Sequence, residues 1–94
     1  MSYHIDPNKV LWRNIDGETI VLNLDNGHYY SLNKTGTFVW TMIEEKYSLE
    51  EIILKVVKKF HIVSDIAKED VTSLVKVLLK EGLLTSPIDQ KGQA

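Results

Sequence analysis

The feature that most constrains this fold is residues 25–43, DNGHYYSLNKTGTFVWTMI, which predicts a turn, a strand and a helix start in succession. The opening Asp-Asn-Gly predicts a tight turn, because Asn and Gly tolerate the positive φ that hairpin turns require. His28–Leu32 then forms a strand candidate with two tyrosines and no proline. Asn33 predicts a helix N-cap. If helices follow, His28–Leu32 ends its sheet, and we expect one edge of that strand to be open.

Two further strands are predicted before this one, at Val10–Ile15 and Glu18–Leu24. Asp16-Gly17 between them is a second hairpin signal. The second strand places its apolar residues in strict alternation, which indicates a sheet packed on one side only. Three strands joined by short turns predict an antiparallel meander of order 1-2-3.

Two helices are predicted next. The first spans about Lys34–Glu45, with a stripe of apolar residues that Trp40 flanks; the stripe consists of Phe38, Val39, Met42 and Ile43. Ser48 and Glu51 form a capping-box pattern that opens the second helix. The core face of that helix is expected to be Leu49, Ile52, Ile53, Val56 and Phe60, and its lysines are expected to face water.

A third helix is predicted over about Asp65–Glu81, with Ser64 as its cap and Gly82 ending it in a left-handed conformation. Its core face is expected to be Val71, Leu74, Val75 and Leu78. Val77 and Leu79 fall on opposite flanks of that face. For each of these two residues, two interpretations remain: the side chain packs on a neighbouring helix, or it lines a groove beside the third strand.

The element order βββααα predicts an α+β fold that is winged helix-turn-helix-like. The 94 residues fit one domain, in which folding buries roughly 60–65% of the extended surface. We expect that domain at residues 10–85, after an irregular N-terminus at 1–9 and before a flexible tail at 86–94.

The composition argues against several classes of protein. The chain has no cysteine, which excludes a disulfide scaffold and a thiolate metal site and suits a reducing cytoplasm. No signal peptide or membrane span is visible, so a cytoplasmic location without membrane contact is expected. The net charge of −2 gives no general attraction to nucleic acid.

The sequence shows little sign of catalytic chemistry. His4, His28 and His61 are scattered, without a second ligand at metal-binding spacing. Gly36 alone does not make a phosphate loop, and no serine sits in a nucleophile-elbow pattern. We therefore predict a non-enzyme that uses no metal and no cofactor.

A winged-helix DNA-binding regulator remains an alternative from another class, because the third helix could act as a recognition helix. The exposed residues of that helix mix both charges, and no arginine occurs after Arg13, although arginine is the usual reader of guanine. The charged residues are Lys68, Lys76, Lys80, Glu69, Asp70 and Glu81. A basic stripe would favour DNA, and the sequence gives a mixed face.

An ordered set of motifs resembles the PqqD-like family, the recognition elements for ribosomally synthesised precursor peptides. The motifs are IVLNLDNGHYYSLNKTGTFVW, the capped SLEEII, Glu69-Asp70-Val71 with its apolar continuation, and Glu81-Gly82-Leu83-Leu84. The resemblance covers about residues 10–85. It is strongest to the small free-standing leader-binding proteins of lasso peptide clusters. The lysine-rich second helix and His28 are not hallmarks of the family.

The resemblance implies that a leader peptide adds as an antiparallel strand to the edge of the third strand, clamped by the third helix, and is delivered to a processing enzyme. That enzyme would be the leader peptidase of lasso peptide biosynthesis or, alternatively, a radical SAM enzyme served by a PqqD-type chaperone. An exposed edge could also pair two copies. The expected peptide-binding residues are His28, Tyr29, Tyr30, Ser31, Leu32, Asp70, Leu74 and Val77. Tyr30 and Leu32 should face opposite to Tyr29 and Ser31.

Overall fold

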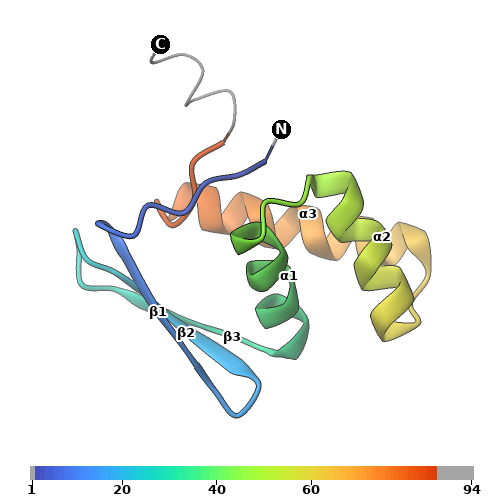
Figure 1. The fold of residues 1–94 in the computed structure, drawn as a ribbon, viewed down its shortest axis with the longest axis horizontal. Helices are drawn as coiled ribbons and strands as arrows, with labels where there is room; N and C mark the ends of the chain where they lie inside the picture. Colours follow the sequence, from blue (N-terminus) through green and yellow to red (C-terminus); the bar gives the residue numbers. More distant parts are fainter. Residues whose placement is uncertain (1, 87–94) are drawn as a thin grey trace.

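The computed structural model describes residues 2–86 and confirms the predicted α+β fold of three strands followed by three helices (Figure 1). The expected tail, residues 86–94, lies outside the described residues except for Ser86. No helix within residues 2–86 is long and apolar enough to cross a membrane. The elements are β1 (Val10–Ile15), β2 (Glu18–Asn23), β3 (Tyr29–Leu32), α1 (Lys34–Glu44), α2 (Leu49–Phe60) and α3 (Ser64–Lys80).

The three strands form the predicted antiparallel meander, with β2 between β1 and β3. Leu22 of β2 lies opposite Leu11 on one side and Tyr29 on the other. β3 begins one residue later than predicted. The pairing nevertheless continues beyond the strand, because the main-chain N–H of Asn23 donates to the carbonyl of His28 at 2.8 Å.

The sheet packs on one side, as predicted, but the packed side is not the more apolar one. Val21 is fully buried between Thr19 and Asn23, whereas Ile20 and Leu22 on the other face of β2 are half-buried. The polar neighbours of Val21 are tolerated because they are hydrogen-bonded. Thr19 Oγ1 donates to Thr37 Oγ1 at 3.0 Å, and Asn23 Nδ2 donates to the carbonyl of Glu81 at 2.9 Å.

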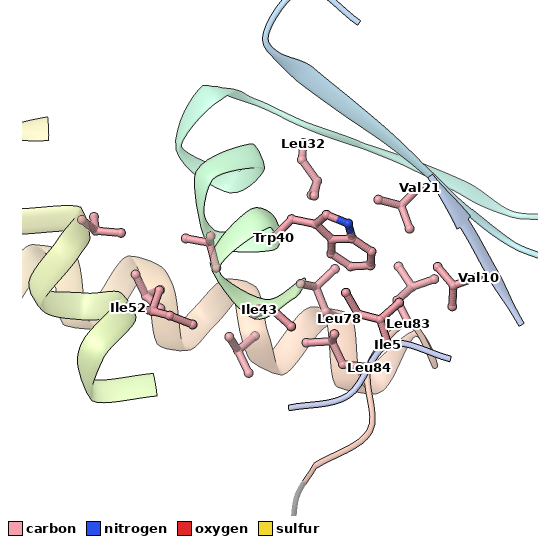
Figure 2. Close-up of a cluster of buried hydrophobic side chains, with 14 of the residues drawn as sticks. Ile5, Val10, Val21, Leu32, Trp40, Ile43, Ile52, Leu78, Leu83 and Leu84 are labelled. Atoms are coloured by element: carbon pink, nitrogen blue, oxygen red, sulfur yellow. The ribbon is translucent and has the colours of Figure 1, made fainter. Parts of the chain in front are cut away.

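Trp40 of α1 lies at the centre of the core, between the sheet and α3 (Figure 2). Its side chain is only 1% exposed, and its ring meets Trp12 of β1 edge-on at a centroid distance of 5.5 Å. The prediction that Trp40 merely flanks the apolar stripe of α1 is therefore wrong. Val39 and Ile43 are buried with it, while Phe38 and Met42 are half-buried and turn toward α2.

The helix ends follow local sequence signals at most positions. The side chain of Asn33 accepts from the Gly36 N–H at 2.9 Å, and Ser48 forms the predicted reciprocal capping box with Glu51. Gly82, at φ 75°, closes α3 with bonds from its own N–H to Leu79 and from the next N–H to Leu78.

The predicted cap of the third helix is wrong. Ser64 is the first helical residue, and Val63 occupies the cap position without any side-chain hydrogen bond. Val63 is extended, and its carbonyl accepts the first helical bond from the Ala67 N–H at 2.9 Å, so the helix begins one residue earlier than predicted.

The N-terminal segment before β1 is tied to the rest of the domain. His4 pairs with Thr85 through main-chain bonds of 3.0 and 2.9 Å, and the side chain of Ile5 is buried in the core. In Figure 1 this segment runs beside the chain that follows α3.

Candidate functional site

The free edge of β3 offers main-chain hydrogen-bonding groups to another strand. Within residues 2–86, β2 is the only strand that pairs with β3. In an antiparallel pair, opposed residues that bond to each other alternate with opposed residues whose main-chain groups point away from the partner strand. Asn23 and His28 are a bonded pair, because the Asn23 N–H donates to the His28 carbonyl. Tyr30 and Leu32 therefore direct their N–H and C=O groups toward β2. Those of Tyr29 and Ser31 point toward the open edge.

The side chains of β3 alternate as predicted. Leu32 is buried and Tyr30 is half-buried against the core, whereas Ser31 is exposed and the Tyr29 side chain is 71% exposed. The residues with outward main-chain groups thus turn their side chains to the open face of the sheet. The core-facing residues anchor the strand.

A groove of about 540 Å³ lies between the end of β3 and the middle of α3, and we call it the β3–α3 groove. Its apolar part comes from Leu32, Phe60, Ile62 and Leu74, and Asp70 is the charged residue in its lining. The remaining lining residues are small or polar: Ser31, Asn33, Thr35, Gly36 and Ser73. The groove can therefore hold an apolar side chain beside an extended main chain.

Gly36 keeps this groove open from the side of α1. A Cβ atom on Gly36 would stand 3.2 Å from the Leu32 Cβ and 3.6 Å from the Leu74 Cδ2. A Cβ at this position would crowd Leu32 of β3, whereas its distance to Leu74 of α3 is an ordinary van der Waals contact. Gly36 therefore contributes both to the shape of the groove and to the start of α1, where its N–H donates to the Asn33 side chain.

A polar clasp joins β3 to the end of α3. The Tyr30 hydroxyl donates to Glu81 Oε1 at 2.6 Å, and the carbonyl of Glu81 accepts from Asn23 Nδ2 at 2.9 Å. The Glu81 carboxylate, by accepting this bond, raises the pKa of Tyr30 above its ordinary value. The clasp holds the sheet against α3 near Tyr30 and so limits the groove to the Leu32 side.

The predicted site residues divide into two groups. Ser31, Leu32, Asp70 and Leu74 line the same groove, although they come from opposite halves of the sequence. His28, Tyr29, Tyr30 and Val77 do not line it. Of these, Val77 belongs by its i, i+4, i+7 spacing to the side of α3 that carries Asp70 and Leu74, and it is 50% exposed.

Sequence reasoning missed several lining residues. Phe60 is predicted to belong to the core face of the second helix and Ile62 lies between the predicted helices, yet both line the groove. Their only local signal is an apolar residue on each side of His61, whose left-handed turn brings them to one wall. Gly36 and Thr35 could have been found, because the motif LNKTG places them directly after β3.

Known proteins share the sequence pattern or the fold of this chain. The family model for "Coenzyme PQQ synthesis protein D (PqqD)" matches residues 18–84. A search of curated proteins found no match. A solved structure, "TbiB1 in Complex with the TbiA(beta) Leader Peptide", shares 26% identity and superposes with a TM-score of 0.80, covering 89% of this chain and 94% of that one.

A second solved structure shows the same fold. It is "Lasso peptide synthetase B1 complexed with the leader peptide", which has 20% identity and a TM-score of 0.78. The match covers 93% of this chain and 100% of that chain. The βββααα arrangement is therefore shared over nearly the whole length of both neighbours.

Proposed function

Because this chain belongs to the PqqD family, we propose that it is a non-catalytic protein that binds the leader region of a ribosomally synthesised precursor peptide. The observation that carries the proposal is the open edge of β3 beside a groove walled by α3. The similarity to TbiB1, which was solved with a leader peptide, supports it.

The leader adds as an antiparallel strand to β3. Its main chain bonds to the N–H and C=O groups of Tyr29 and Ser31, each bond contributing about 0.5–1.5 kcal/mol. An apolar leader side chain enters the β3–α3 groove beside Leu32 and Leu74, where burial contributes about 1.5–3 kcal/mol. The main chain supplies affinity for any extended segment, and the groove supplies selectivity.

The third helix clamps the leader from the opposite side. Leu74 forms an apolar wall, and Asp70 offers a carboxylate to a donor on the leader. Val77, half-exposed on the same side of α3, extends the apolar wall from Leu74 beyond the groove.

The bound leader is then delivered to a processing enzyme, which we infer to be the leader peptidase of a lasso peptide pathway. The solved lasso peptide synthetase B1 supports this choice by its shared fold. The PqqD family match keeps a radical SAM enzyme as the second candidate. Pull-down of each enzyme class by the chain with its leader bound decides between them. Recovery of the radical SAM enzyme alone would remove the lasso assignment.

The binding step is tested with overlapping peptides that tile candidate short precursor peptides, sought among the genes that neighbour this chain's gene. We expect one leader segment to raise the fluorescence polarisation saturably, and segments from the core of the precursor to give no signal. A properly folded chain that binds no segment of those precursors would refute the proposal.

Acidic substitutions on α3 should separate binding from folding. Val77→Glu is expected to weaken leader binding about ten-fold with little loss of stability, because Val77 is half-exposed and a buried unpaired charge is unfavourable in the complex. Leu74→Glu should weaken binding at least as much and also lower the melting temperature, because Leu74 packs on the core.

The matched control for this pair is Lys76→Glu, an exposed position on another face of α3, which should leave binding unchanged. Fluorescence polarisation measures affinity, and thermal melts followed by circular dichroism measure stability. Unaltered affinity in folded Val77→Glu would exclude this part of α3 from the site.

A further inference from the structure

A second concave surface lies between α1 and α2, and neither the fold nor leader pairing to β3 accounts for it. It has a volume of about 340 Å³, and we call it the basic hollow. Phe38 and Met42 of α1 and Tyr47 of the α1–α2 connection give it an apolar floor. Lys55, Lys58 and Lys59 of α2 give it a cationic rim.

Aromatic rings hold two of the rim lysines over this surface. Lys55 Nζ lies 4.5 Å from the centre of the Tyr47 ring, and Lys59 Nζ lies 5.5 Å from the centre of the Phe38 ring. Such cation–π contacts favour these side-chain directions without neutralising the ammonium charges. Two of the three rim lysines therefore lie over the apolar floor before any partner arrives.

The helix itself offers these charges little compensation. Lys58 and Lys59 have no acidic residue three or four positions away, and Glu51 is the only one at such a spacing from Lys55. The Glu51 carboxylate accepts from the Ser48 N–H at 2.9 Å, and this bond, helped by the charge of Lys55, lowers the pKa of Glu51, so Lys55 is partly compensated and Lys58 and Lys59 are not compensated by their own helix. A local positive patch thus stands out on a chain whose net charge is −2.

The basic hollow adjoins the β3–α3 groove. Phe60 lines the groove, Phe38 lines the hollow, and their rings meet edge-on at a centroid distance of 5.6 Å. Lys59 Nζ lies 5.9 Å from the centre of the Phe60 ring, so it stands over the boundary. A bound peptide that extends from the groove past Phe60 would therefore enter the basic hollow directly.

We propose that the basic hollow binds an acidic stretch of the same precursor peptide, located on the N-terminal side of the segment that pairs with β3. The polarity rests on the proposed function. A leader antiparallel to β3 has its N-terminal part at the Leu32 end, and Leu32 and Phe60 line the same groove. Carboxylates then meet the rim lysines, and an apolar residue among them covers Phe38 and Met42.

The first test uses an isolated probe, so it does not depend on leader binding. Acetyl-Asp-Glu-Phe-Glu-Asp-amide is titrated into ¹⁵N-labelled protein at low salt, with acetyl-Asn-Gln-Phe-Gln-Asn-amide as the neutral counterpart. We expect the acidic probe to shift the amide signals of Phe38, Met42, Lys58 and Lys59, and the neutral one not to. Absence of shifts from the acidic probe would overturn the inference and leave the proposed function intact.

The second test measures polarity on the leader segment that binds in the tiling experiment. Adding the acidic pentapeptide to its N-terminus is expected to strengthen binding about five-fold at low salt, with the gain lost at 0.3 M NaCl. Adding it to the C-terminus should give no gain. Equal gains at both ends would show unspecific attraction and contradict the inference.

Matched charge variants complete this design. Lys58→Gln/Lys59→Gln should abolish the gain and leave binding of the unextended segment unchanged. Lys68→Gln/Lys76→Gln removes the same charge from exposed positions on α3 and should preserve the gain. A gain that survives the α2 variant would exclude the hollow. If no segment binds wild-type protein, the proposed function fails and the isolated probe alone decides the role of the hollow.

Discussion

Replacing Ser31 with proline is expected to weaken leader binding about 10- to 100-fold while the domain remains folded. Proline removes the N–H of Ser31, which points to the open edge of β3, and its ring blocks the approach of another strand. The pairing of β3 with β2 uses the main-chain groups of Tyr30 and Leu32, so the sheet itself should persist. Fluorescence polarisation with the leader segment gives the affinity.

Ser31→Ala is the matched control, because it removes the hydroxyl but keeps the N–H. It should bind the leader like the wild-type protein. Thermal melts establish that Ser31→Pro is folded. Loss of binding in both variants would assign the effect to the side chain, and full binding by folded Ser31→Pro would contradict strand addition at this position.

Replacing Trp40 with alanine is expected to produce the largest loss of stability, about 3–5 kcal/mol. Trp40 is among the largest fully buried side chains, and its loss leaves a cavity between β1 and α3 against the edge of Trp12. The free energy of unfolding of a domain is typically about 5–15 kcal/mol, so the substitution removes a large part of it. Urea unfolding followed by circular dichroism measures the difference.

Trp40→Phe serves as the comparison. It should destabilise much less, because phenylalanine refills most of the volume. It also removes an indole N–H that is buried without a hydrogen-bond partner within residues 2–86. Equal destabilisation by both substitutions would mean that the volume of Trp40 is not what stabilises the core.

Local structure could be predicted from the sequence where a few neighbouring residues determine it. Asn33 caps α1, Ser48 with Glu51 caps α2, and Gly82 ends α3, because each side chain or φ angle acts within one helical turn. The cap of α3 could not be predicted in this way, because Val63 occupies the cap position without a side-chain hydrogen bond and so leaves no cap signal in the sequence.

Tertiary placement could not be predicted in the same way. Apolar alternation shows that β2 has two unlike faces, but only the packing of α1 decides which face is covered. Val21 is buried beside two hydrogen-bonded polar residues, while the more apolar row lies on the open face. The central position of Trp40 likewise depends on Trp12, which lies in a distant part of the sequence.

Part of the candidate site could be predicted, and the rest depended on the fold. The order of elements placed Ser31 and Leu32 at an open edge, and helical spacing placed Asp70 with Leu74. Phe60 carried no signal that separated it from core residues, since its role depends on where α2 ends. The clasp between Tyr30 and Glu81 joins residues far apart in the sequence and could not be predicted from spacing.

The most direct measurement of the central claim is hydrogen exchange of the β3 amides with and without saturating leader, read by NMR. Strand addition predicts that the amides of Tyr29 and Ser31 slow on the order of ten-fold or more, because the leader occupies their free side. The amides of Tyr30 and Leu32, already directed at β2, should change far less. Unchanged exchange at Tyr29 and Ser31 in the saturated complex would contradict the account.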